Sequence, residues 1–188
     1  MIICCGESLI DMLPRKMADG KAGFAPSPGG AVFNTAIALG RLGTPVALLS
    51  GVSRDLFGDM LVASLQASNV LTSSLVRSDQ PTTLAFVTLK DGQATYTFFD
   101  ENSAGRMLYI SDMPVPAAKA FFFGGISLAA DPAGHAYETM MAQVAPDCVT
   151  MLDPNVRAAF ISDDTAYRAR CRGTLDRDGA LTLARFVA

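Results

Sequence analysis

A pair of glycines that opens an apolar helix is the feature that most constrains this chain. Gly29 and Gly30 stand directly before residues 31–42, a helix-forming run that Gly43 ends. Glycine lets the backbone approach a ligand closely, because it has no Cβ and tolerates positive φ. The first turn of a helix presents unpaired N–H groups. With Asn34 as donor and acceptor, this corner predicts a site for a hydroxyl-rich or anionic small molecule, or else a tight turn without a ligand.

Short apolar runs alternate with amphipathic segments along the chain. We expect strands at residues 2–10, 46–49, 120–123 and 149–152, and helices at residues 31–42, 57–68 and 132–144. This alternation is typical of an α/β fold with a doubly wound parallel sheet. Residues 83–89 and 94–99 flank Asp91 and Gly92 and predict a hairpin, which adds a small β layer. Residues 12–28 predict a loop or short exposed strands.

Composition limits the functions that this chain can have. The net charge of −3 argues against a general nucleic-acid or anionic-membrane binder, and no apolar run reaches the ~18 residues that span a bilayer. The cysteines have neither C-x-x-C spacing nor a neighbouring histidine cluster, which favours reduced thiols in a cytoplasmic protein over a zinc or disulfide framework. His135 follows a predicted helix start, where a capping or surface role is expected.

A set of sequence blocks covers residues 2–160 in a fixed order. The blocks are GESLID at 6–11, GGAVFN at 29–34, ALGRLG at 38–43, GVSRDLFG at 51–58 and DPNVR at 153–157. Together they resemble the motifs of the ribokinase/PfkB carbohydrate-kinase family. The first and last blocks are most similar to the fructokinase and 2-keto-3-deoxygluconate kinase branch. The chain departs from the pattern at Val32, where a small residue or proline is usual, and at Ser53, where glycine is usual.

The resemblance implies one partial ribokinase-like domain over residues 1–188, with β-lid segments at about 12–28 and 83–108. It also implies a sugar site and, for Asn155, a place near the phosphate. The expected sugar-binding residues are Asp11, Gly29, Gly30, Asn34, Phe98, Arg106 and Arg157. Other roles stay open for some of them: Asp11 as a turn cap, Phe98 as hairpin core and Arg157 in a surface ion pair. Arg106 could meet an acidic sugar or only water.

Phosphoryl transfer requires a base, a phosphate cradle and Mg²⁺. The family carries the first two in a Gly-Ala-Gly-Asp block after the D-x-N-x-R segment, and this sequence contains no such block. We therefore expect the C-terminal half of the fold to be missing, and no catalytic residue or metal ligand is assigned. Residues 181–187 predict a helix fragment.

Two functions follow from the resemblance. The first is an ATP- and Mg²⁺-dependent kinase for a small sugar, either fructose-like or 2-keto-3-deoxygluconate-like. The second is a non-catalytic sugar-binding or interaction module. A homodimer through the β lid is an expected partner arrangement, since open hairpin edges invite strand addition. A Rossmann-type oxidoreductase is disfavoured, because no G-x-G-x-x-G follows the first strand.

Overall fold

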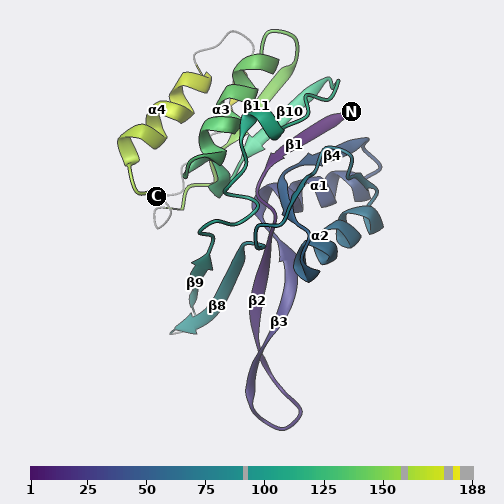
Figure 1. The fold of residues 1–188 in the computed structure, drawn as a ribbon, viewed down its shortest axis with the longest axis vertical. Helices are drawn as coiled ribbons and strands as arrows, with labels where there is room; N and C mark the ends of the chain where they lie inside the picture. The colour runs from purple at the N-terminus through teal and green to yellow at the C-terminus, as the bar shows by residue number, and fades with distance from the viewer. Residues whose placement is uncertain (91–92, 158–160, 176–179, 183–188) are drawn as a thin grey trace.

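A six-stranded parallel sheet forms the centre of the computed structural model, which describes residues 1–90, 93–157, 161–175 and 180–182 (Figure 1). In spatial order its strands are β12 (Ala180–Thr182), β11 (Val149–Asp153), β10 (Ala120–Gly124), β1 (Ile2–Gly6), β4 (Val46–Leu49) and β6 (Val70–Leu71). The chain runs outward from β1 to β4 and β6, then continues on the other side of β1 with β10. The boundary between β1 and β10 is thus a topological switch point, where sheets of this kind bind ligands at the carboxyl ends of their strands.

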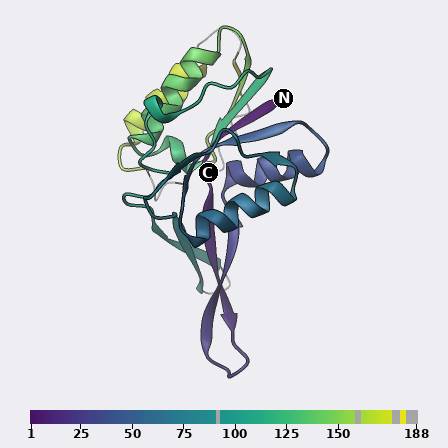
Figure 2. The same cartoon turned by 45° about the vertical axis from the view of Figure 1, so that its right-hand side comes forward.

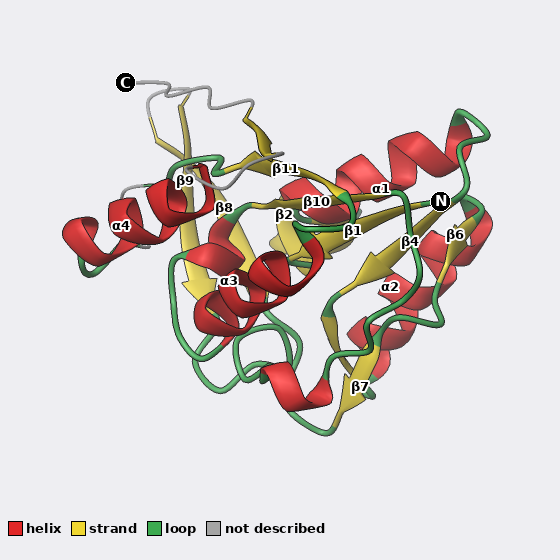
Figure 3. Cartoon of the chain, turned by 90° about the horizontal axis from the view of Figure 1, so that it is seen from above, coloured by secondary structure: helices red, strands yellow, loops and turns green. Residues whose placement is uncertain are grey.

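Helices cover both faces of this sheet (Figures 1 and 3). The helices α1 (Ala31–Arg41) and α2 (Leu56–Ala67) lie on one face, and α3 (Ala133–Val144) lies on the other with α4 (Asp164–Leu175) beside it. Side chains alternate along β1: Cys4 packs in the core under α1 and α2, and Ile3 and Cys5 pack in the core under α3. Both faces of the strand are therefore apolar. The expected doubly wound α/β fold is confirmed.

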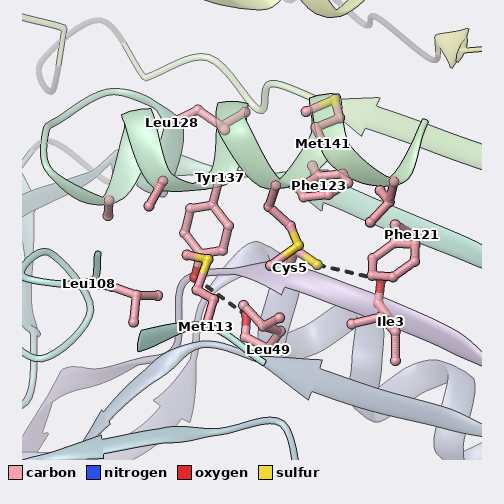
Figure 4. Packing of buried hydrophobic residues seen from close by; sticks show 14 of the residues in the cluster. Ile3, Cys5, Leu49, Leu108, Met113, Phe121, Phe123, Leu128, Tyr137 and Met141 are labelled. Atoms are coloured by element: carbon pink, nitrogen blue, oxygen red, sulfur yellow. Dashed lines mark hydrogen bonds between the residues drawn. The ribbon is translucent and has the colours of Figure 1, made fainter. Parts of the chain in front are cut away.

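The core under α3 contains the large polar side chain of Tyr137 (Figure 4). Tyr137 is 1% exposed, and its hydroxyl lies 3.3 Å from the Gly6 carbonyl oxygen and 3.4 Å from that of Leu49. Burial holds the pKa of Tyr137 well above its ordinary value, so the hydroxyl remains a donor. Tyr137 therefore ties α3 to the carboxyl ends of β1 and β4.

A second sheet projects from the carboxyl end of the first (Figure 2). Its strands, in spatial order, are β3 (Ala22–Gly29), β2 (Leu9–Lys16), β8 (Leu84–Lys90) and β9 (Gln93–Phe99). We call these four strands the side sheet. Its two hairpins are antiparallel, and β2 and β8 join them in parallel. A small pair, β5 (Gly51–Ser53) and β7 (Val76–Ser78), and the 3₁₀ helices η1 (Ile110–Asp112) and η2 (Ile126–Leu128) complete the described elements.

Some sequence expectations need correction. The apolar run 2–10 forms two strands in different sheets, because the chain leaves the central sheet at Glu7 and Ser8. Residues 12–28 lie in the β2–β3 hairpin, the second of the two alternatives considered for them. The expected turn at 91–92 lies outside the described residues. The expected helix at 181–187 is wrong where it can be compared, since β12 includes residues 181 and 182; residues 183–187 lie outside the described residues.

None of the helices that the structure describes is both long enough and apolar enough to cross a lipid bilayer.

Candidate functional site

The carboxyl ends of three neighbouring strands meet at one edge of the central sheet. Gly6 of β1 is in register with Gly124 of β10, which is in register with Asp153 of β11. The start of α1 comes to the same edge, since a Cβ on Gly30 would lie only 2.9 Å from the Glu7 carbonyl oxygen. This edge is where the site has to be built.

The carboxylate of Glu7 lies against the N-terminus of α1. Its side chain is buried, and Oε1 accepts hydrogen bonds from the amides of Ala31 at 2.7 Å and Val32 at 3.4 Å. Oε2 accepts from the Ser127 hydroxyl at 3.0 Å. Burial raises the pKa of the Glu7 carboxyl, and the hydrogen bonds that it accepts offset only part of this rise. The expectation that these amides face a ligand is therefore wrong, because the protein supplies its own carboxylate there.

The sequence predicted Asp11 at the end of the first parallel strand. In the structure Asp11 lies in the side sheet instead. It is the third residue of β2, half-buried, and its carboxylate packs on Gly29 so closely that a Cβ there would overlap it. Burial raises the pKa of Asp11. Gly30, with φ 110°, is the N-cap of α1, and its carbonyl accepts the Asn34 amide at 2.8 Å. Asp11 and the exposed Asn34 thus both adjoin the glycine pair.

A cavity of about 990 Å³ lies between the side sheet and the segment after β10. Phe98 of β9 and Arg106 line one part of it, and Ile126 and Ala129 line another. Phe98 is half-buried, and its ring stacks on Tyr96 with centroids 5.9 Å apart. The cavity therefore offers an aromatic surface and a guanidinium together, which suits a polar ring that carries hydroxyl or acidic groups.

Asn155 and Arg157 line a shallow hollow after β11, and Ile126 and Ala129 contribute to this hollow as well as to the cavity. The Asn155 amide donates to Asp153 Oδ1 at 3.0 Å, which braces the loop. Arg157 is exposed. The structure thus brings Phe98 and Arg106 together on the cavity, with Asn155 and Arg157 in the adjoining hollow. Asp11, Gly29, Gly30 and Asn34 form a separate group at the start of α1 and are not among the residues that line either space.

The profile of pfkB family carbohydrate kinases matches residues 1–173. This chain belongs to that family. A fructokinase of Rhizobium leguminosarum bv. trifolii is 49% identical over 174 residues, which cover 92% of this chain and 53% of that protein. Probable fructokinase-7 of Arabidopsis thaliana is 35% identical over 180 residues, covering 89% and 52%. The crystal structure of fructokinase from Xylella fastidiosa matches with a TM-score of 0.84 at 27% identity, over 93% of this chain and 56% of that one. The chain spans about half the length of these relatives.

The pfkB resemblance of the sequence gave no role to two residues that join the two groups of the site. Glu7 and Asp100 both line a small hollow of about 20 Å³ together with Arg106. Glu7 reaches the start of α1, as described above, and Asp100 accepts hydrogen bonds from Thr83 at 2.7 Å and Ser103 at 2.9 Å. The sequence did contain a signal for Glu7, because an acidic residue stands directly after the first strand. The bond between Asp100 and Ser103 is local, but the bond to Thr83, 17 residues earlier in the chain, has no local signal.

Proposed function

We propose that this chain is the sugar-binding part of an ATP-dependent carbohydrate kinase whose acceptor is fructose or an acidic relative such as 2-keto-3-deoxygluconate. The observation that carries the proposal is the cavity lined by Phe98 and Arg106, in a chain that is 49% identical to a fructokinase over 174 residues. A cavity of this size has ample room for a six-carbon sugar. A structure of the X. fastidiosa fructokinase holds ATP, which supports ATP as the phosphate donor.

The proposal assigns a role in sugar binding to each of four side chains. The Asp11 carboxylate accepts hydrogen bonds from sugar hydroxyls, and Asn34 both donates and accepts. Phe98 lies against the apolar face of the ring, and Arg106 meets a carboxylate or a hydroxyl. Because Asp11 and Asn34 lie apart from the cavity, the sugar must extend from the cavity to the glycine pair or the side sheet must move toward α1.

The proposal assigns few of the described residues to ATP or Mg²⁺. The amides at the start of α1 already donate to Glu7, so this helix offers no free phosphate cradle. Within the described ranges, no three His, Cys, Asp or Glu side chains gather where they could hold a metal ion. Asn155 and Arg157 are the described groups that suit a phosphate. The proposal therefore assigns neither a catalytic base nor a Mg²⁺ ligand to this part of the chain.

Calorimetric titration of the chain with fructose and with 2-keto-3-deoxygluconate tests the proposed function. We expect saturable heat with at least one of the two sugars. A folded chain that gives no heat with either sugar would overturn the proposal and favour an interaction module that does not bind sugar.

Replacing Arg106 by alanine distinguishes the two acceptors. If the acceptor is acidic, Arg106→Ala is expected to weaken 2-keto-3-deoxygluconate binding about tenfold or more, because a charge-assisted hydrogen bond is lost. Fructose binding is expected to change by about twofold or less. Arg54→Ala is the matched control, since Arg54 is exposed and pairs with the exposed Asp79 at 3.3 Å. An equal loss for both sugars would contradict a carboxylate-reading role for Arg106.

A further inference from the structure

Asp55 stands immediately before α2, and its carboxylate bonds to two separate parts of the fold. Oδ1 accepts the Gly58 amide at 2.8 Å, which caps the first turn of α2. Oδ1 also accepts the Thr82 hydroxyl at 2.7 Å, and Oδ2 accepts the Thr82 amide at 2.9 Å. An N-cap needs only one acceptor, so the two bonds to Thr82 go beyond what the helix requires.

Thr82 lies at the root of the β8–β9 hairpin. It is 7% exposed, stands two residues before β8 and lines the cavity. The next residue, Thr83, accepts the Ile10 amide of β2 at 3.0 Å through its carbonyl and donates to Asp100 at 2.7 Å. Asp100 follows β9 directly. The two ends of the hairpin are therefore joined to each other through Thr83 and Asp100, and the hairpin is joined to α2 through Asp55.

The Asp55 side chain is a charged carboxylate at neutral pH. Burial alone would raise the pKa of Asp55, but the bonds from Gly58 and Thr82 outweigh it and the pKa is lowered. The carboxylate is therefore charged, and both bonds from Thr82 are charge-assisted. Asp55 itself is not among the residues that line the cavity. It can influence a ligand through Thr82 and through the position of the hairpin that follows Thr82.

We propose that Asp55 is a positioning residue that anchors the β8–β9 hairpin to α2 and so holds the Phe98 wall of the cavity in place for the sugar. The part of this inference that concerns sugar rests on the proposed function, and the anchoring part does not. A residue that only capped α2 would affect α2 alone, and this difference makes the proposal testable.

Asp55→Ser separates the two roles. Serine caps a helix about as well as aspartate, so the Gly58 bond is kept, but its single short hydroxyl cannot also hold Thr82. Hydrogen exchange is measured on the whole chain for β8, β9, α2 and β1. We expect the described amides of β8 and β9 to exchange about tenfold faster, because two hydrogen bonds at the hairpin root are lost, with α2 and β1 unchanged. Val144→Ala, a core truncation in α3 at a residue 5% exposed, is the matched control for general destabilisation.

Unchanged exchange in β8 and β9 would overturn the anchor, as would faster exchange spread equally over all four elements. Sugar affinity is then compared by calorimetry, and Asp55→Ser is expected to bind at least about fivefold more weakly than Val144→Ala. Equal affinity in the two variants would overturn the positioning role while leaving the anchor intact. If the natural chain itself binds neither sugar, the proposed function fails, and the exchange data still decide whether Asp55 anchors the hairpin.

Discussion

Glu7→Ala is expected to lower the free energy of unfolding by about 3 kcal/mol. The truncation removes the acceptor of the Ala31 and Val32 amides and the partner of Ser127. Hydrogen bonds to a charged group contribute about 1.5–3 kcal/mol each, and buried donors left without a partner add to the cost. Urea denaturation followed by circular dichroism gives the value. A loss below about 1 kcal/mol would contradict the bracing role of Glu7.

Glu7→Gln is the matched variant. Its amide oxygen can still accept from Ala31, and its amide nitrogen can donate to Ser127 while the Ser127 hydroxyl keeps its 3.1 Å bond to the Gly124 carbonyl. We expect a loss of about 1 kcal/mol or less. A loss as large as that of Glu7→Ala would show that the negative charge, and not the bonding geometry, carries the stabilisation.

The difference in stability between the natural chain and Glu7→Gln is expected to depend on pH. The pKa of Glu7 is raised by burial, so the native state binds a proton more tightly than the unfolded chain, whose glutamates titrate at about 4.3. The stability contributed by this proton is fully present below that pH and is lost as the pH rises through the raised pKa. The stability of the natural chain relative to Glu7→Gln should therefore fall over this interval. A difference that rises with pH would contradict the buried position of Glu7.

Most elements of the fold could be predicted from the sequence because packing on both faces of a parallel sheet leaves a local signal. The strands at 46–49, 120–123 and 149–152 are apolar runs, and their structural counterparts have the same bounds or extend by one residue. The break inside 2–10 left no such signal. Ile3 in the central sheet and Ile10 in the side sheet are both 0% exposed, so hydrophobicity is the same on the two sides of the break.

The candidate site was less predictable because it depends on contacts between distant residues. Asp11 was expected at the end of the first parallel strand. That strand ends at Gly6, so Asp11 belongs to β2 of the side sheet. The hydrogen-bond acceptor for the first amides of α1 is Glu7, which lies 24 residues before Ala31 in the sequence. Phe98 and Arg106 were singled out from the resemblance, and the opposite wall at Ile126 and Ala129 was not, since no local pattern joins η2 to β9.

Gly125→Ala is expected to lower the free energy of unfolding by about 3 kcal/mol, for two separable reasons. Gly125 has φ 72° and ψ −162°, a backbone region that is essentially restricted to glycine and costs an alanine about 1 kcal/mol or more. A Cβ at this position would also overlap the Glu7 carboxylate, which would have to leave its bonds with α1. Gly43→Ala is the control for a positive φ without a steric overlap, because Gly43 has φ 79° and no atom within 4 Å of its Cβ position; it should cost only about 1 kcal/mol.

The steric part of this cost should disappear when Glu7 is truncated. In a Glu7→Ala background the carboxylate is gone, so Gly125→Ala is expected to cost only about 1 kcal/mol, a coupling energy of about 2 kcal/mol between the two positions. Denaturation of the two single variants and the double variant measures this coupling. Additive losses would mean that Gly125 and Glu7 do not share this space. A coupling of the expected size would show that the glycine after β10 serves to admit the carboxylate that caps α1, which links the two groups of the site through one buried side chain.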